Sequence, residues 1–280
     1  MSERKHPPQP GNSRERWVTA GELRELCSRD DDAVIVDRKV ARLHRLECPS
    51  AIRLTAGESA KSFGTLKRLC LAVSERRLAG ARRVVAVGGG TVGDVAALAA
   101  HMVRRGMPLV HVPTTLLAAV DSSIGGKAAI NSPGGGKNVF GAFHFAGECL
   151  LCEEIWTTLS PQQHRDGLVE ALKMAVCLDA GLAGRWRSDP PGTREMVTEG
   201  RRLKAAARRT EDLFTELGLP GRRLLANSLR DHGWQQFQRA LALDKKGLYT
   251  FVVLREIGEA ETAEVPEAVV KSLFGGWRGR

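Results

Sequence analysis

The residues best suited to chemistry lie in a single stretch, from Arg83 to Asn138. Within it, three consecutive glycines, Gly88 to Gly90, follow an apolar β-branched run. Glycines let the backbone approach a pyrophosphate closely, and the free N–H groups of a following helix, with its dipole, favour negative charge. The later part of the stretch is a glycine-rich loop with four polar side chains, Asp121, Lys127, Lys137 and Asn138. Four such side chains are more than a connecting loop requires, so the loop is a candidate functional site.

The segments around the glycines are expected to form a strand, a helix and a second strand. Val84–Val87 and Leu109–Val112 are short and apolar, and a helix of small residues is expected between them. This order, with the glycine turn, is typical of a nucleotide-binding β-α-β unit. Asp94 falls in the first helical turn, where it could cap the turn or hold a ribose or substrate hydroxyl. Turns before buried helices also use glycine, so the triplet alone would be weak evidence.

Two earlier segments carry acidic residues where a nucleotide could bind. An expected strand ends in Asp37, whose carboxylate could bind ribose or adenine groups or only form a turn. A second expected strand, Ala51–Leu54, precedes a turn with Glu58 and Lys61, and a helix is expected from near Ser62. Glu58 would accept hydrogen bonds from ribose hydroxyls, or the segment is a capped helix start without a ligand.

The second half of the chain is expected to be mainly helical. After an expected strand at Glu148–Ile155, the helical pattern runs from Ser160 to near Leu217, with a break at residues 187–193. Glu170 and Lys173 are three residues apart and share one helix face, as a functional pair or a surface ion pair. A group of basic residues is expected to be mostly a solvated helix face: Arg201, Arg202, Lys204, Arg208 and Arg209.

Composition indicates an ordinary globular protein. The 280 residues are 42% hydrophobic and 26% charged, and no apolar run is long enough to span a membrane. The first sixteen residues lack an apolar signal region, so we expect residues 1–16 to be disordered and the protein to be cytoplasmic. The six cysteines are then expected to be reduced and buried. Cys149 and Cys152 form a CxxC, but the second pair that a zinc knuckle needs is missing.

The net charge of +10 has two explanations. It suits a nucleic acid, or it suits a phosphorylated, acidic substrate and an anionic cofactor. No recognition motif supports nucleic-acid binding, so we expect a small-molecule ligand. Steep salt dependence of binding would indicate the other explanation.

Several long motifs resemble those of the 3-dehydroquinate synthases and their relatives, the sugar phosphate cyclases. The similarity runs from about Asp37 to Ala260, and its motifs are GGGTVGD, RRG, VPTTLLAAVDSSIGGKAAIN, GKN, GAF, SPQQHRDGLVEALKMAVCLDAG, LGLP, DKK and FVVLREIGEA. The resemblance implies an α/β fold. A Rossmann-like, parallel-sheet NAD-binding domain (residues 17–158) would be followed by a reduced all-helical domain (residues 159–280). It also implies a homodimer.

The resemblance assigns roles to individual residues. Arg105 would reach into the site of a neighbouring subunit to hold the substrate phosphate, and Glu170 would be a ligand of a divalent metal, zinc or cobalt. The other implied substrate-binding residues are Asp121, Asn138, Lys173, Lys204, Lys245 and Lys246. The residues implied to bind NAD are Asp37, Glu58, Lys61, Gly88, Gly89, Gly90, Thr91, Val92, Gly93, Asp94, Thr114, Thr115, Lys127, Lys137, Ile155, Trp156, Thr157 and Thr158.

The sequence departs from this family in its helical part. The family's metal has two further ligands, both histidines, on a GHTxGHA-like helix and in an HGE-like turn, and neither motif is present. The chain passes from RRTED to LFTELGLP as if the helices between had been removed, an apparent internal deletion. One carboxylate does not hold zinc or cobalt tightly. A smaller departure is SPGGGKN, which has one residue more than the usual spacing before Lys137.

By resemblance, the implied activity is the NAD-dependent cyclisation of 3-deoxy-D-arabino-heptulosonate 7-phosphate to 3-dehydroquinate, with release of phosphate. This is a step of the shikimate pathway of aromatic amino acid biosynthesis, and NAD would be regenerated in every turnover. Two alternatives stay open beside nucleic-acid binding. One is another sugar phosphate cyclase of secondary metabolism, and the other is an NAD-binding relative without the metal site and without turnover.

Overall fold

The computed structural model describes residues 13–46, 48–216, 249–256 and 259–265. The chain forms two compact units, Met1–Met174 with Pro191–Thr210, and Ala175–Pro190 with Glu211–Arg280. The first unit therefore contains the described residues of the expected NAD-binding domain and also parts of the helices that follow it. The domain limits expected from the sequence do not coincide with these units and stay a prediction.

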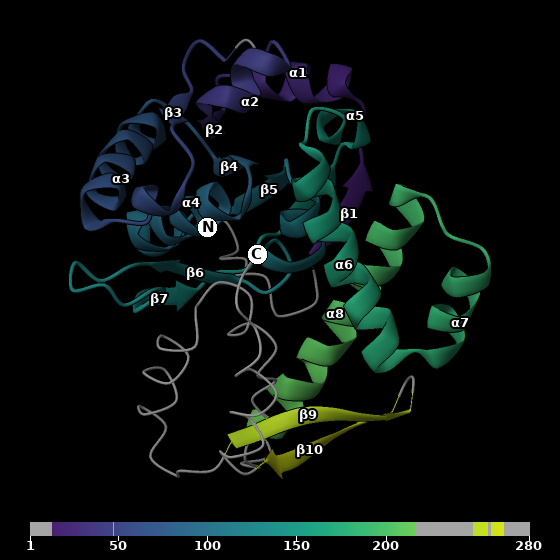
Figure 1. Ribbon diagram of the computed structural model, residues 1–280. Coiled ribbons are helices and arrows are strands. Elements are labelled where there is room, and N and C mark those ends of the chain that lie inside the picture. The colour runs from purple at the N-terminus through teal and green to yellow at the C-terminus, as the bar shows by residue number, and fades with distance from the viewer. Residues whose placement is uncertain (1–12, 47, 217–248, 257–258, 266–280) are drawn as a thin grey trace. The chain divides into compact units, whose positions relative to one another are not determined.

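The first unit is built on a six-stranded sheet in the order β1-β8-β5-β4-β2-β3, drawn in purple to teal in Figure 1. All of its strand pairs are parallel, which confirms the expected α/β class. The strands are β1 (Arg14–Trp17), β2 (Asp32–Asp37), β3 (Ile52–Leu54), β4 (Arg83–Gly88), β5 (Leu109–Pro113) and β8 (Glu148–Leu151). A separate antiparallel pair consists of β6 (Lys127–Ile130) and β7 (Phe140–Phe143).

Helices cover both faces of the sheet because its central strands are apolar on both sides. Val34 and Val36 of β2 pack with α1, α2, α5, α6 and α8, whereas the alternate residues Ala33 and Ile35 pack with α3 and α4. The helices are α1 (Ala20–Ser28), α2 (Arg38–Leu43), α3 (Phe63–Leu78), α4 (Gly90–Met102), α5 (Glu153–Trp156), α6 (Pro161–Leu178), α7 (Ala180–Ser188) and α8 (Thr193–Glu216). No described helix combines the length and apolarity needed to cross a membrane.

The strand order reverses between β2 and β4. The chain leaves β2 through α2 on one face towards β3, and it leaves β4 through α4 on the other face towards β5. Ligands of open parallel sheets bind outside the carboxyl ends of the strands at such a switch point. Asp37 ends β2 and Gly88 ends β4, in strands whose Val36 and Val87 are paired. The fold therefore brings two predicted NAD-binding residues to the same end of neighbouring strands.

The sequence predicted the starts of two helices, α3 and α6, correctly. Ser62 caps α3 by accepting a hydrogen bond from the Thr65 N–H at 3.3 Å. Ser160 accepts one from the Gln163 N–H at 3.2 Å just before α6. Both are small hydroxyl residues that satisfy otherwise unpaired N–H groups of a first turn.

Three expectations about local structure were wrong. Arg14–Trp17 forms the edge strand β1, although residues 1–16 were expected to be disordered; residues 1–12 lie outside the described part. The strand that begins at Glu148 ends at Leu151, and Glu153–Trp156 is helical. The part after residue 159 is not all helical, because β9 (Tyr249–Glu256) and β10 (Glu259–Val265) form an antiparallel pair in the second unit.

A π-helical turn, Ala118–Ser122, follows β5 and carries Asp121. Such turns are rare and occur frequently at functional sites. Two glycines pack helices closely around it. A Cβ on Gly167 of α6 would overlap the Leu116 side chain and lie 2.7 Å from its carbonyl carbon, and a Cβ on Gly200 of α8 would lie 2.9 Å from that of Ala171. Larger side chains at either position would push the helices away.

We predict that Gly167→Ala lowers the free energy of unfolding by about 2 kcal/mol, because backbone and side-chain atoms at Leu116 leave no space for the added methyl group. Urea denaturation at neutral pH measures this loss. The matched control is Gly64→Ala in α3, where a Cβ would meet nothing within 4 Å. The control should keep or gain stability, and equal losses in both variants would contradict the packing argument.

Candidate functional site

The first turn of α4 is suited to an anion. Its N-cap is Gly89, which brings no side chain to bond the first N–H groups. A Cβ on Gly89 would lie 3.2 Å from Thr115 Cγ2, and one on Gly90 would lie 3.2 Å from Ser122 Oγ. Glycine at both positions thus lets the helix start lie directly against the segment after β5. The first-turn N–H groups and the helix dipole favour a phosphate at this point.

Lys61 ties α4 to the loop before β7. Its ammonium lies 2.6 Å from Asp94 Oδ2 and donates to Asn138 Oδ1 at 2.6 Å. Asn131 donates to Glu58 Oε1 at 2.7 Å and accepts from the Asn138 N–H at 2.9 Å. We call these five residues the Lys61 cluster. It unites four of the predicted site residues, and Asn131 is an addition that the sequence analysis missed.

A second group of charges lies between the π-helical turn, α6 and α8. Lys204 Nζ is 2.7 Å from Asp121 Oδ1 and 3.7 Å from Glu170 Oε1. Lys173 Nζ is 2.6 Å from the same Glu170 oxygen. Glu170 is buried, whereas the side chains of Lys173 and Lys204 are 23% and 25% exposed. These four residues, which we call the acid–lysine cluster, were all predicted site residues, and the two lysine side chains are partly exposed.

The two clusters meet at the start of α4. Asp94 belongs to the Lys61 cluster, and Ser122, the neighbour of Asp121, packs against Gly90. Burial raises the pKa of Asp94, Lys61 opposes this rise, and the carboxylates of Asp121 and Glu58 add to it. Asp94 therefore takes up a proton at higher pH than an exposed aspartate does. Carboxyl groups with such shifted pKa values are common where proton transfer occurs.

The structure fits NAD at the switch point. The glycine turn, the helix start without a side-chain cap and the end of β2 coincide there. Asp37 caps α2 by accepting from the Lys39 N–H at 2.7 Å, and Thr115 Oγ1 accepts from the Ala118 N–H at 3.1 Å. Thr114 is buried and donates its N–H to the Gly88 carbonyl at 3.0 Å. These residues lie at or near the carboxyl ends of β2 and β5, and their contacts with NAD stay predictions.

Of the predicted NAD-binding residues after β8, two are buried in the core and two are exposed. Ile155 and Trp156 are buried in the core, where Trp156 Nε1 donates to the Pro113 carbonyl at 3.0 Å. Their side chains therefore stabilise the end of β5 rather than face a ligand. Thr157 is exposed, and Thr158 Oγ1 lies 2.9 Å from His44 Nε2.

Other predicted residues lie on the surface. Lys127 of β6 and Lys137 are exposed. Arg105 is exposed after α4 and has a φ of 64°, an uncommon value for a residue with a side chain. Its reach into a neighbouring subunit stays a prediction. Lys245 and Lys246 lie outside the described residues.

The described residues do not fit a tightly held divalent metal. Among them there is no group of three or more histidine, cysteine, aspartate or glutamate side chains that could hold an ion. Glu170, the predicted ligand, is instead in contact with the ammonium groups of Lys173 and Lys204. Zinc sites in proteins have three or four ligands from such side chains. We therefore derive no step through a metal.

Two buried residues near the site were missed by sequence analysis. Arg201 belongs to the basic group that was expected to be mostly a solvated helix face. It is 1% exposed and follows the buried Val197 by four residues on α8. That helical spacing was the available signal. His111 of β5 is buried beside Gly93, where a Cβ would lie 3.2 Å from His111 Cε1. An alternating strand pattern cannot reveal a buried histidine.

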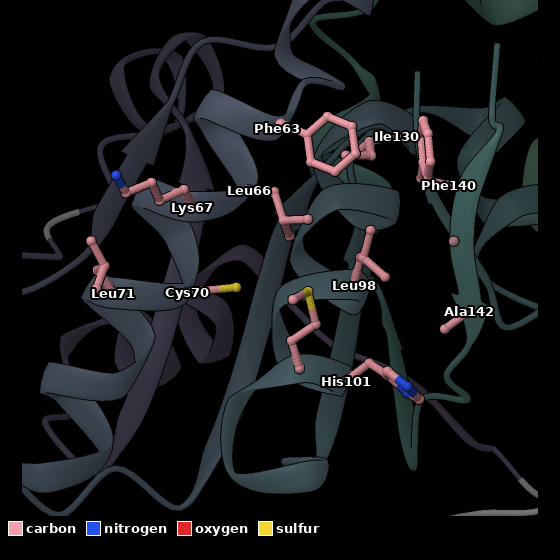
Figure 2. A pocket seen from close by; sticks show the side chains of 12 residues that line it. Phe63, Leu66, Lys67, Cys70, Leu71, Leu98, His101, Ile130, Phe140 and Ala142 are labelled. Atoms are coloured by element: carbon pink, nitrogen blue, oxygen red, sulfur yellow. The ribbon is translucent and has the colours of Figure 1, made fainter. Parts of the chain in front are cut away.

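An apolar pocket of about 550 Å³ lies elsewhere in the first unit. Figure 2 shows it between α3, α4 and β6–β7, with Phe63 and Phe140 at one end and His101 at the other. None of the predicted site residues lines it. The pocket is therefore separate from the two polar clusters.

We predict that Lys61→Met lowers the free energy of unfolding by about 3 kcal/mol at pH 7, because it leaves the largely buried Asp94 carboxylate without its cation. The pKa of Asp94 is already raised by burial, so protonation relieves this cost. The loss should therefore shrink as the pH is lowered towards 5, as urea denaturation would show. Lys67→Met, an exposed lysine of α3, is the control. A loss independent of pH would argue against Asp94 as the cause.

We predict that His111 makes the fold acid-sensitive. Burial lowers its pKa from 6.5 to about 4, with the positive charges of Arg201 and His144 adding to the effect. Between these pH values the unfolded chain binds a proton that the folded chain does not, so stability falls as the pH falls from 6.5 towards 4. The full effect is about 3 kcal/mol.

In His111→Gln the free energy of unfolding should change less between pH 7 and pH 4.5 than in the unaltered protein. His164→Gln, on α6, serves as the control and should keep the original pH dependence. The same pH dependence in all three proteins would show that His111 is not responsible.

Comparisons with known proteins show what this chain is similar to. Residues 51–166 match the family model described as 3-dehydroquinate synthase N-terminal. The chain is 42% identical over 160 residues to 3-dehydroquinate synthase of Rhodopseudomonas palustris (strain BisA53), covering 54% of this chain and 42% of that protein. It is 39% identical over 191 residues to that of Paracoccus denitrificans (strain Pd 1222), covering 62% and 52%. The chain spans about half the length of these curated relatives.

Solved structures share the fold at low identity. One is 2-epi-5-epi-valiolone synthase from Streptomyces hygroscopicus subsp. jinggangensis 5008 with NAD+ and Zn2+ bound: 20% identity, TM-score 0.68, 98% of both chains. Another is 2-deoxy-scyllo-inosose synthase complexed with carbaglucose-6-phosphate, NAD+ and Co2+: 19% identity, TM-score 0.66, 92% of this chain and 95% of that one. Residues 51–166, in the α/β part of the chain, are therefore similar to the N-terminal domain of 3-dehydroquinate synthases.

Proposed function

We propose that this protein is a 3-dehydroquinate synthase-type enzyme. It binds NAD at the switch point and cyclises 3-deoxy-D-arabino-heptulosonate 7-phosphate to 3-dehydroquinate with release of phosphate. The observation that carries the proposal is the contact between the two parts of the site. The glycine turn that suits a pyrophosphate packs, through Gly90 and Ser122, on the π-helical turn that carries Asp121, and Lys204 of α8 contacts Asp121 there.

The accessible charges of the acid–lysine cluster suit this substrate. The heptulosonate phosphate carries a carboxylate and a phosphate, and the cationic side chains of Lys173 and Lys204 are each partly exposed. An anionic substrate group would exchange places with Glu170 or Asp121 at these lysines, so that the ion pairs present before binding are replaced rather than lost. When bound, NAD supplies reversible hydride transfer at a ring alcohol.

The Lys61 cluster supports the same proposal on the other side of α4. It fixes Asp94 by a short ion pair and aligns Asn138 and Asn131 through hydrogen bonds. Asp94 accepts and holds a proton more readily than an exposed aspartate does, because burial raises its pKa. A carboxyl of this kind, next to an NAD site, suits proton transfer from a substrate hydroxyl.

A second candidate is an NAD-binding relative without turnover. It is favoured by one observation, that Glu170 is in contact with two lysines where the family's metal would bind. In this case the glycine turn would bind NAD, but phosphate would not be released.

One experiment separates the two candidates. NAD affinity is measured by calorimetry, and phosphate release from the heptulosonate 7-phosphate is measured with NAD and added zinc or cobalt. For the unaltered protein we expect both NAD binding and phosphate release. Gly89→Ala should weaken NAD binding about tenfold or more, because a Cβ would crowd Thr115 and the approaching pyrophosphate.

Gly64→Ala is the matched control and should leave NAD binding unchanged, since its Cβ meets nothing within 4 Å. NAD binding without phosphate release would favour the second candidate. If neither NAD binding nor phosphate release occurs, both candidates fail.

A further inference from the structure

A buried arginine outside the predicted site residues joins three elements of the first unit. Arg201 of α8 is 1% exposed. Its Nη1 donates to Ser123 Oγ at 2.8 Å and to the carbonyl oxygen of Ala119. Its Nε and Nη2 donate to Glu15 Oε1 of β1 at 2.9 and 2.7 Å. A guanidinium is kept out of water only where such partners replace its hydration.

The π-helical turn provides one of these acceptors. In an α-helix the Ala119 carbonyl would accept the N–H of Ser123, four residues later. Here the Ser123 N–H donates to Ala118 instead, at 3.1 Å. The Ala119 carbonyl is thereby left for Arg201 and for the Ser123 hydroxyl, which donates to it at 3.3 Å. The π-helical backbone of this turn therefore provides an acceptor that the buried Arg201 uses.

The contacts of Arg201 bracket Asp121. Ala119 and Ser123 lie two residues before and two residues after Asp121 in the chain. Lys204 lies three residues after Arg201 on α8 and is 2.7 Å from Asp121 Oδ1. Two side chains from one turn of α8 thus contact this segment. The guanidinium of Arg201 contacts Ala119 and Ser123, and the ammonium of Lys204 contacts Asp121 between them.

We infer that Arg201 is a positioning residue: it holds α8 on the π-helical turn so that Lys204 stays at Asp121 and Glu170, ready for an anionic group of the substrate. The role of Lys204 towards substrate rests on the proposed function, whereas its placement by Arg201 rests on the contacts alone. A lysine at this position could not replace the arginine, because the planar fork reaches Glu15 on one side and the turn on the other.

Competitive labelling of lysines with acetic anhydride, read by mass spectrometry, tests the placement in the full chain without any ligand. In Arg201→Met we expect labelling of Lys204 to rise about threefold, because its ion pair with Asp121 is loosened. Lys173 pairs with Glu170 within α6 and should keep its labelling, so it is the internal reference. Arg202→Met is the matched control, since this neighbouring arginine is exposed and contacts Glu199.

Ser123→Ala is a milder variant that removes one of the hydrogen bonds from Arg201 and keeps its pairing with Glu15. It should raise the labelling of Lys204 by a smaller factor, and it decides the matter if Arg201→Met does not fold. Unchanged labelling of Lys204 in the folded variants, or an equal rise at Lys173, would overturn the inference.

Kinetics then separate the inference from the proposed function. If the unaltered protein releases phosphate, Arg201→Met should raise the KM for the heptulosonate phosphate about tenfold while NAD affinity is unchanged. An unchanged KM would contradict a role towards substrate. If the unaltered protein releases none, the proposed function fails, and the labelling result still decides whether Arg201 places Lys204.

Discussion

Close approach at three glycines is the constraint on which the site depends. Gly90 of α4, Gly167 of α6 and Gly200 of α8 lie where a Cβ would press on Ser122, Leu116 and Ala171. Because glycine has no side chain, α4 and α6 approach the segment after β5 directly at Gly90 and Gly167, and α8 approaches α6 at Gly200. Lys173 and Lys204, which lie on different helices, can then reach the same buried carboxylate. The site thus follows from helix packing more than from any single loop.

The charges of the site are balanced before a ligand arrives. Each lysine of the two clusters contacts a carboxylate at 2.6 or 2.7 Å, and the buried Arg201 contacts the carboxylate of Glu15. Such pairing is required because charges cost several kcal/mol each when they are removed from water without a partner. It also means that an anionic ligand competes with carboxylates of the protein. Affinity would then depend on the difference between two sets of ion pairs.

The similarity of the chain to 3-dehydroquinate synthases and the surroundings of Glu170 lead to different expectations. Residues 51–166 are similar to the N-terminal domain of 3-dehydroquinate synthases, and two cyclases that share the fold were solved with NAD+ and with Zn2+ or Co2+. In the described part of this chain, lysines contact the glutamate that would bind the ion. Ammonium groups and a divalent cation cannot share one carboxylate favourably. Phosphate release is therefore the decisive property, since NAD binding alone is compatible with both candidate functions.

The sequence by itself determined the parallel α/β fold, the glycine turn before α4 and the helix starts at Ser62 and Ser160. These features depend on local spacing and on the strand-helix order, which leave plain patterns. Only the tertiary structure decided that Glu170 contacts two lysines, that Arg201 is buried and that Arg14–Trp17 joins the sheet. Each of these depends on a partner far away in the chain, such as Glu15 for Arg201. A local pattern of residues does not encode which distant carboxylate a buried cation will meet.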